Sequence, residues 1–351
     1  MICEHHREAE LNLKTDGKKV NLALQGGGSH GAFTWGVLDR LLEDDRIVIE
    51  GIVGTSAGAM NAAITAHGLL QSGKEGARAA LRRFWMAVAE AGVLSLMQPS
   101  WLDRLAGRGS LDFSLGWTMA DALSRLLSPY QFNPVNYHPL RDILAEQIDF
   151  DNLRRMTGVK LFVCASNVMT NRLRVFDRHD ICLEAVLASA CLPTVFQAIE
   201  LNGEFYWDGG YMGNPPLFPI AYYCASPDVI LIMINPIRIQ EVPKSAQAIL
   251  DRINTLSFNS SLMREMRAID FVNRLVDSGV NDGGRLKKML IHCIEAEDDM
   301  RGLGVSSKLN VDADFLSWLF ELGRVRADAF LKAHFDKIGK QSSTDIESRF
   351  L

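Results

Sequence analysis

A serine flanked by glycines, at the point where a buried strand leads into a helix, constrains the fold of this chain most. The apolar segment 46–56 predicts the strand, and the small-residue segment 57–70 predicts the helix. Gly54 and Gly58 flank Ser56 in a G-x-S-x-G pattern, and their lack of side chains allows a sharp turn. We therefore expect the Ser56 hydroxyl to project from one edge of a sheet, facing the amides of the helix N-terminus.

The segments around this turn alternate between strand and helix. Buried strands are predicted at 19–25, 46–56, 160–168, 172–178, 203–210, 228–235 and 288–296, and helices at 31–45, 57–70, 181–190, 246–278 and 311–336. Strands that alternate with helices are typical of a mostly parallel sheet covered by helices. The fold class is therefore predicted to be α/β.

Charge and composition argue against several kinds of partner. The 351 residues include 37 Lys or Arg and 42 Asp or Glu, for a net charge of −5, and they form no local basic cluster. A protein that neutralises phosphates needs such a cluster, so we expect no nucleic acid as a partner.

The six cysteines and the apolar runs bear on the cellular compartment of the protein. The cysteines occur singly, outside any zinc-binding spacing, which favours a reducing environment and predicts no metal. The N-terminal segment has no apolar signal region, and no apolar run reaches the length of a membrane span. We expect a cytoplasmic location.

A run of glycines follows the first predicted strand. Residues 25–31 read QGGGSHG, and consecutive glycines let backbone amides point at one spot and bind an anion. In one interpretation the amides of Gly27 and Gly28 form an oxyanion hole for acyl transfer. A tight turn with no ligand is the plain alternative.

A second interpretation treats the same loop as a dinucleotide-binding fingerprint. Gly26, Gly28 and Gly31 have the required spacing, and Glu50 is placed as a ribose-binding acid at the end of the next strand. The serine turn that follows Glu50 at once disfavours this interpretation, because a dinucleotide site does not need a nucleophile there.

A third glycine turn contains an aspartate. Asp208 precedes Gly209 and Gly210 at the end of the predicted strand 203–210. Such a turn is commonly only structural. A serine hydroxyl, however, needs a base to become nucleophilic, and no histidine lies in a recognisable motif. Asp208 is therefore the candidate base for Ser56.

These three motifs, in this order, resemble the patatin-like phospholipase family over about residues 19–235, and the similarity extends through the strand at 288–296. The resemblance implies a three-layer α/β/α fold with a central, mostly parallel sheet, plus C-terminal helices. It also implies that Ser56 is the nucleophile, Asp208 the base and the glycine loop the oxyanion hole. A lipid acyl hydrolase that forms an acyl-enzyme and uses no cofactor is the implied activity, with a lipid or acyl ester as substrate.

The glycine loop departs from the family pattern at one point. The family loop often has Arg or Lys after the glycines, whereas this chain has Ser29 and His30 there. We expect His30 to order the loop and to have no catalytic role.

Two other functions remain open at this point. Ser56, Asp208 and His292 follow the chain order of an α/β-hydrolase triad, although His292 lies within a predicted strand. A lipid-binding scaffold with a degenerate site is disfavoured because all three motifs are intact.

The predicted division of the chain has four parts. They are a polar tail (1–18), the catalytic domain (19–297), a helical extension (298–338) and a second polar tail (339–351). Residues 97–135 are a candidate cap or ordinary helical packing. Within them Leu115, Met119, Leu123 and Leu126 share one helix face that suits transient contact with a membrane surface.

The substrate and the assembly state stay open. A further apolar stripe, in the helix predicted at 311–336, either packs on the core or forms a dimer. The lipid headgroup, the oligomeric state and the choice between hydrolysis and acyl transfer are not predicted.

Overall fold

The computed structural model describes residues 17–93, 98–100, 102–103, 109–280, 283 and 285–351. Most of the predicted N-terminal tail, 1–18, and parts of the candidate cap, 97–135, therefore lie outside the described residues. Among the described residues, no helix combines the length and the hydropathy that a membrane span requires.

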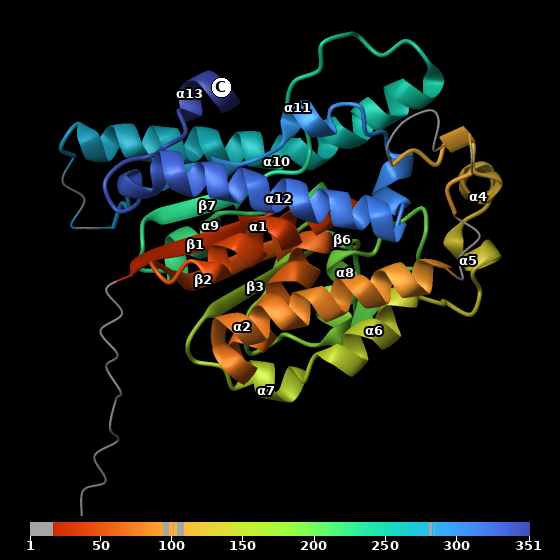
Figure 1. Ribbon diagram of the computed structural model, residues 1–351, viewed down its shortest axis with the longest axis horizontal. Helices are drawn as coiled ribbons and strands as arrows, with labels where there is room; N and C mark the ends of the chain where they lie inside the picture. Colours follow the sequence, from red (N-terminus) through yellow and green to blue (C-terminus); the bar gives the residue numbers. More distant parts are fainter. Residues whose placement is uncertain (1–16, 94–97, 101, 104–108, 281–282, 284) are drawn as a thin grey trace, which may run out of the picture.

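A single eight-stranded sheet forms the centre of the molecule (Figure 1). Its strand order is β5-β6-β3-β2-β1-β7-β8, and β4 pairs with β3. The strands are β1 (Lys18–Leu24), β2 (Ile47–Thr55), β3 (Lys160–Asn167), β4 (Leu173–Phe176), β5 (Ile199–Leu201), β6 (Glu204–Asp208), β7 (Asp228–Ile232) and β8 (Leu290–Ile294). The five strands from β3 to β8 along this order are parallel, whereas β4 and β6 run antiparallel to β3, and β5 antiparallel to β6.

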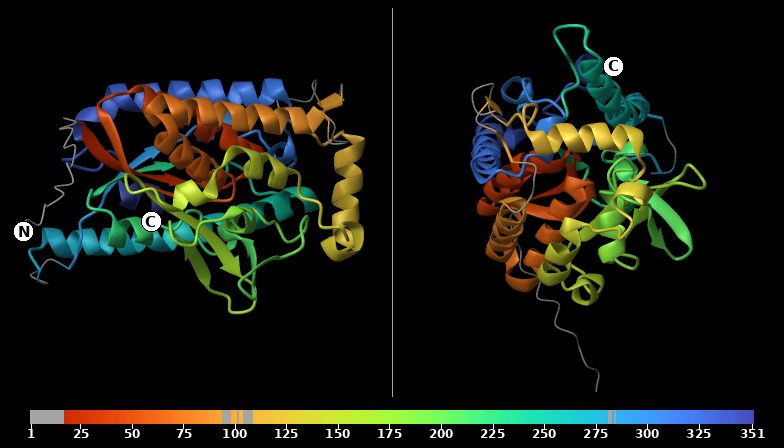
Figure 2. Two further views of the ribbon diagram at one scale, coloured as in Figure 1. Left: turned by 90° about the horizontal axis from the view of Figure 1, so that it is seen from below. Right: turned by 90° about the vertical axis from the view of Figure 1, so that its right-hand side faces the viewer.

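Helices cover both faces of the sheet. The α-helices are α1 (Gly31–Glu43), α2 (Ala57–Val93), α4 (Leu115–Leu126), α5 (Pro129–Phe132), α6 (Pro139–Gln147), α7 (Phe150–Arg154), α8 (Leu183–Ser189), α9 (Phe218–Tyr223), α10 (Ala246–Asp277), α11 (Glu297–Met300), α12 (Ala313–His334) and α13 (Ile346–Phe350). Short 3₁₀ turns are η1 (Gly28–His30), η2 (Gly209–Tyr211), η3 (Ser306–Leu309) and η4 (Phe335–Lys337). The left view of Figure 2 shows the sheet between α1, α2 and α12 on one side and α10 on the other.

Alternating side chains of the strands build two separate cores. Leu22 and Leu24 of β1 join the core under α1, α2 and α12, while Ala23 between them joins the core under α9 and α10. Successive side chains of a strand point to opposite faces, so a strand covered on both sides is apolar throughout. This arrangement confirms the predicted three-layer α/β class with a mostly parallel sheet.

Most elements agree with the sequence predictions. Every predicted strand is present, and β5 is an additional short one. The helix predicted at 57–70 continues as α2 to Val93, with a kink where Ser72 and Gly73 leave helical geometry.

The C-terminal helix α12 is part of the main core. A Cβ placed on Gly36 of α1 would lie 1.9 Å from the Phe320 carbonyl oxygen, so α1 and α12 cross in direct backbone contact. Phe315, Leu319 and Phe330, from the apolar stripe, are at most 5% exposed. The stripe therefore packs on the core of its own chain.

The segment 339–351, predicted as a polar tail, completes the edge of the sheet. The amide of Ile291 in β8 donates to Ser342 Oγ, and that of Cys293 donates to Thr344 Oγ1, each at 3.0 Å. These hydroxyls satisfy amides that an edge strand would leave unpaired. The helix α13 follows and buries Phe350.

Candidate active site

All three sequence motifs meet at the carboxyl edge of the sheet. The glycine loop follows β1, and Ser56 follows β2. Thr55, just before Ser56, pairs with Cys164 of β3, and the next residue, Ala165, pairs with Asp208 of β6. Ser56 and Asp208 therefore flank the end of β3, although they are 152 positions apart in the chain.

Ser56 lies in a sharp turn with a left-handed backbone conformation. Its φ is +56°, a region that residues other than glycine rarely adopt. Its carbonyl oxygen accepts the Ala59 amide at 2.9 Å and begins α2, and its own amide donates to Ser189 Oγ at 2.9 Å. A Cβ on Gly58 would lie 2.2 Å from the Leu24 carbonyl oxygen, so only glycine allows this turn to pack on β1.

Asp208 is a fully buried carboxyl with one oxygen left over. Oδ1 accepts the Gly210 amide at 2.7 Å. Oδ2 has no hydrogen-bond partner among the residues that the structure describes. Burial raises the pKa of this carboxyl to about 7, while the Gly210 amide, the Ser56 hydroxyl and the Lys308 ammonium oppose the rise. The group can therefore accept a proton near neutral pH.

The serine turn and the aspartate turn are in contact. A Cβ on Gly209 would lie 3.0 Å from Thr55 Cγ2, so the two turns pack side by side. The Ser56 hydroxyl influences the pKa of Asp208, yet no hydrogen bond of ordinary geometry joins the two side chains. The two side chains are therefore neighbours in the structure.

The glycine loop lies directly against the serine. A Cβ on Gly26 would lie 2.5 Å from Ser56 Cβ. Two asparagines hold Gly26: its amide donates to Asn214 Oδ1 at 2.7 Å, and its carbonyl oxygen accepts Asn235 Nδ2 at 2.7 Å. No described residue accepts a hydrogen bond from the amides of Gly27 or Gly28. These two amides are therefore available to a negatively charged ligand.

His30 fastens the loop to the C-terminal part of the chain. The His30 ring is buried, and Nε2 lies 2.8 Å from Ser307 Oγ in η3. Burial, together with the nearby charge of Lys308, lowers the pKa of His30 to about 3. The imidazole is therefore neutral at physiological pH, in accord with a role in ordering the loop.

Lys308 is a residue of this site that the sequence analysis missed. It lies in η3, and a Cβ on Gly28 would be 2.1 Å from the Lys308 carbonyl oxygen. Gly28 has φ +61°, so both its conformation and this close approach require glycine. No motif surrounds Lys308 in the sequence, and only the packing of η3 brings it to the loop.

His292 is engaged away from the site. Its Nε2 lies 3.0 Å from Asp228 Oδ1, and its Nδ1 lies 2.9 Å from Ser343 Oγ. Asp228 is the first residue of β7 and therefore lies toward the amino ends of the parallel strands, opposite to Ser56. The structure does not bring His292 together with Ser56 and Asp208.

Glu50 does not end a strand, contrary to the dinucleotide interpretation. It is an interior residue of β2, at a bulge where Val20 pairs with Ile49 and Asn21 pairs with Gly51. Its carboxylate accepts the amides of Ala225 and Ser226 before β7. A ribose-binding acid belongs at the carboxyl end of its strand, where the glycine loop lies, and Glu50 points to the other end.

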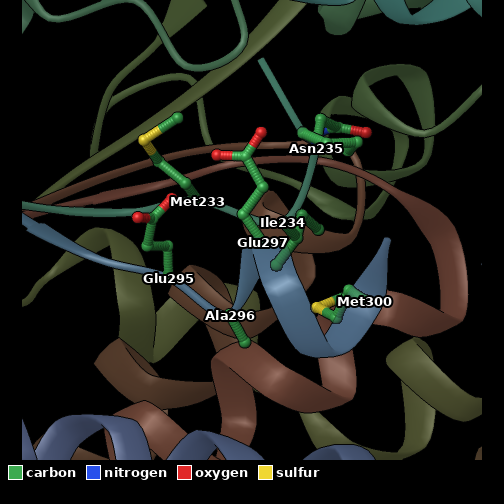
Figure 3. A pocket seen from close by; sticks show the side chains of 8 residues that line it. Met233, Ile234, Asn235, Glu295, Ala296, Glu297 and Met300 are labelled. Carbon is green, nitrogen blue, oxygen red and sulfur yellow. The ribbon is translucent and has the colours of Figure 1, made fainter. Parts of the chain in front are cut away.

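A small hollow lies behind the glycine loop. Figure 3 shows its lining, which includes Ile234, Asn235 and Met300. Its volume of about 10 Å³ has room for no more than a water molecule. Neither Ser56 nor Asp208 lines it, so it is not a substrate pocket. No three His, Cys, Asp or Glu side chains within the described ranges cluster as a metal site would require.

Comparison with known proteins decides the family. The sequence model described as patatin-like phospholipase matches residues 22–221, more than half of the chain. The chain belongs to the patatin-like phospholipase family. Family membership makes it a carboxylic ester hydrolase that acts on lipids. A search of curated proteins gave no match.

Three solved structures are similar over most of this chain. VipD from Legionella pneumophila is 14% identical, with 95% of this chain and 72% of that chain covered and a TM-score of 0.44. The type III effector protein ExoU is 14% identical, with 90% and 53% covered and a TM-score of 0.33. The ExoU–SpcU heterodimer from the type III secretion system of Pseudomonas aeruginosa is 16% identical, with 92% and 61% covered and a TM-score of 0.31.

Proposed function

We propose that this patatin-like protein cleaves lipid carboxylic esters with a Ser56–Asp208 dyad. One observation supports this most strongly: the Asp208 carboxyl is fully buried beside the serine turn and has an oxygen without a hydrogen-bond partner in the described part of the chain. A buried acceptor without a hydrogen-bond partner lowers the stability of the folded protein, so its presence calls for a functional explanation. Acceptance of the Ser56 proton by Asp208 Oδ2 is such an explanation.

The proposed reaction has two steps. Ser56 Oγ attacks the ester carbonyl carbon while Asp208 takes the hydroxyl proton, and the amides of Gly27 and Gly28 stabilise the tetrahedral oxyanion. The proton then passes to the leaving alcohol, and an acyl-Ser56 ester remains. In the second step Asp208 takes a proton from a water molecule whose oxygen attacks the acyl carbon. The acyl carbon–Ser56 Oγ bond breaks, the proton passes from Asp208 to Ser56 Oγ, and the carboxylic acid leaves.

The surroundings favour a dyad over a triad. Both ring nitrogens of His292 have partners, Asp228 and Ser343, at a different part of the sheet. His30 is nearer to the loop, but its pKa of about 3 makes it an ineffective base at neutral pH, and its Nε2 is bound to Ser307.

The test is a panel of acyl esters that differ in chain length and headgroup, measured with the wild type and with Ser56→Ala. We expect hydrolysis to fall by at least ~10⁴-fold in the variant, because the nucleophile is absent. A fluorophosphonate probe should label the wild type at Ser56 and leave Ser56→Ala unlabelled.

Two results would count against the proposal. Comparable turnover by Ser56→Ala would exclude Ser56 as the nucleophile. A folded wild type that neither reacts with the probe nor cleaves any ester would favour a scaffold with an inactive site instead.

We also propose that the end of the molecule near Ser56 touches the lipid surface from which substrate is drawn. The apolar face of α4 is exposed rather than packed: Leu115 is 75% exposed and Leu126 is 81% exposed. Ile253 and Leu256, near the start of α10, are exposed as well. Figure 1 places α4 and the start of α10 at the same end of the molecule. Exposed apolar side chains on such helices are typical of interfacial binding.

The segment that contains α4 is tied to the glycine loop through η3. The Leu111 amide donates to Ser306 Oγ at 3.4 Å, and Asn310 Nδ2 donates to the Gly109 carbonyl oxygen at 3.1 Å. Contact of α4 with lipid would therefore act on a segment that is hydrogen-bonded to η3, next to the glycine loop.

A vesicle experiment tests this contact. Replacing Leu115 and Leu126 together by Ser should weaken binding to phosphatidylcholine vesicles by ~10-fold or more, because two apolar side chains would no longer enter the lipid. Hydrolysis of a water-soluble ester should be unchanged. Val325→Ser, at a 62% exposed position of α12, is the control for the loss of an exposed apolar side chain elsewhere. Unaltered vesicle binding by the double variant would refute the contact.

A further inference from the structure

The glycine loop is covered by a lysine that comes from the far end of the chain. Lys308 lies 280 residues after Gly28, outside the matched range 22–221, and its backbone closes over Gly28. Ser29 Oγ and His30 Nε2 both bond to Ser307, the preceding residue, at 2.7 and 2.8 Å. The loop therefore holds the η3 segment that contains Lys308 in place.

The ammonium group reaches the loop through an asparagine. Lys308 Nζ donates to Asn235 Oδ1 at 2.8 Å. The same oxygen lies 3.7 Å from the point where a Cβ on Gly27 would stand, and the Asn235 amide nitrogen donates to the Gly26 carbonyl oxygen at 2.7 Å. Asn235 is 2% exposed and Lys308 is half-buried, so the asparagine end of this bridge is shielded from solvent.

The charge of Lys308 also acts on the proposed base. It favours the carboxylate form of Asp208, and Asp208 in turn favours the charged form of Lys308. Burial works in the other direction and lowers the pKa of Lys308 to about 8. The lysine therefore keeps its proton at neutral pH, in a setting where a positive charge has a strong effect.

We propose that Lys308 is a positioning residue that supplies the positive charge of the oxyanion loop, in the place left open by Ser29 and His30. This inference rests on the proposed dyad. A cation fixed behind the Gly27 and Gly28 amides favours the negative charge that develops on the substrate oxygen in the transition state. The same cation favours the carboxylate form of Asp208, which is the form that accepts the serine proton.

The groups that face these two side chains come from several elements. Around Asp208 they are Ser56, Tyr211 of η2, Cys191 after α8 and Lys308. Around Lys308 they are Asp208, Asp251 of α10 and His30 of η1. Of these groups Lys308 is the cation at neutral pH, because His30 is neutral there. A substitution of Lys308 therefore removes the positive charge from this group of side chains.

The experiment compares Lys308→Met, which keeps most of the length and removes the charge, with Lys308→Arg, which keeps the charge. Steady-state hydrolysis of a 4-nitrophenyl acyl ester is measured from about pH 5 to pH 9. We expect Lys308→Met to lower kcat by ~10- to 100-fold with a smaller change in KM, because the charge acts on the transition state. The acid limb of its kcat/KM profile should move to higher pH, since Asp208 loses a cation that favours its carboxylate. Lys308→Arg should restore most of both.

Lys332→Met is the matched control, because Lys332 of α12 forms its ion pair with Asp328 at the surface. It should keep the wild-type kcat and pH profile. Thermal unfolding of each variant reports whether it folds. If Lys308→Met does not fold, Lys308→Gln takes its place, and the rate of fluorophosphonate labelling against pH gives a second readout.

The outcomes separate this inference from the proposed function. A folded Lys308→Met enzyme with the wild-type kcat and acid limb would overturn the role of Lys308 while the dyad stands. A loss of activity that Lys308→Arg does not restore, with no shift of the acid limb, would also overturn it, because it would indicate packing alone. Turnover by Ser56→Ala would instead reject the dyad itself.

Discussion

Two buried aspartates, Asp208 and Asp228, lie at different ends of the sheet and have opposite surroundings. Asp228 is 2% exposed, and its Oδ1 is bonded to His292 Nε2 at 3.0 Å and to the Gly339 amide at 2.8 Å. Asp208 is fully buried, with Gly210 on Oδ1 and no hydrogen-bond partner for Oδ2 among the described residues. Both side chains are buried, and the difference lies in the hydrogen bonds that their carboxyl oxygens accept.

The comparison distinguishes a buried carboxyl that joins elements of the fold from one that we propose as a catalytic base. Asp228 and His292 join β7, β8 and the C-terminal segment, so their bonds hold elements together. The Asp208 backbone bonds to Cys191 and Ser166, but its carboxyl bonds to Gly210 of its own turn, and its Oδ2 has no hydrogen-bond partner among the described residues. In mostly parallel sheets, ligands bind at the carboxyl ends of the strands, which is the end where Asp208 lies.

The strongest test of the comparison is the exchange of each carboxylate for an amide. Asp208→Asn should lower ester hydrolysis by ~10³-fold, because an amide cannot take the serine proton. Asp228→Asn, the matched variant at the other end, should leave kcat within ~2-fold. Both are checked by kcat on the best ester of the panel. Similar losses of kcat in the two variants would contradict the proposal that Asp208 is a base and Asp228 is structural.

The second test concerns stability. His292→Ala removes a fully buried ring that bonds to Asp228 and Ser343, and it leaves the Asp228 carboxylate with one partner fewer. We expect the free energy of unfolding to fall by about 2 to 4 kcal/mol, measured by denaturant titration. The kcat of the folded fraction should be that of the wild type. A loss of kcat by more than ~100-fold in folded protein would favour the triad instead.

The smallest expected effect is a pH-dependent gain in stability. Burial raises the pKa of Asp208 from its ordinary 3.8 to about 7. Between these values the unfolded chain binds fewer protons at this group than the folded chain, so its contribution to wild-type stability falls as the pH rises. Asp208→Asn removes this contribution. The stability of the variant relative to the wild type should therefore grow by about 2 kcal/mol from pH 5 to pH 8.

Thermal and denaturant unfolding at the two pH values check this prediction. Asp228→Asn is again the control, and its difference from the wild type should not grow in the same direction. A constant difference between Asp208→Asn and the wild type across this range would mean that the Asp208 carboxyl titrates normally.

The sequence predicted the layers of the fold because local patterns contain that information. Residues 19–25 and 46–56 are largely apolar without a strict alternation, which indicates strands buried on both faces, and β1 and β2 fill these segments within a residue or two. Gly54 and Gly58 around Ser56 predicted a sharp turn, and the φ of +56° at Ser56 agrees. These features depend on residues a few positions apart.

Contacts between distant segments could not be predicted in this way. Nothing near Lys308 in the sequence distinguishes it from a surface lysine, and His292 looked equally suited to a triad. The segment 342–344 looked like a polar tail because its hydroxyls have no local purpose, and their partners are the amides of β8. Each role depends on a partner far away in the chain.

By itself the sequence determined the order of strands and helices, the three glycine turns and the family, because propensity, periodicity and tight turns are local properties of the backbone. Only the tertiary structure decided that Asp208 Oδ2 has no hydrogen-bond partner among the described residues, that His292 bonds to Asp228 at the far end of the sheet and that Lys308 covers the glycine loop. Burial and electrostatic interaction depend on everything that surrounds a group in space, and packing alone brings those surroundings together.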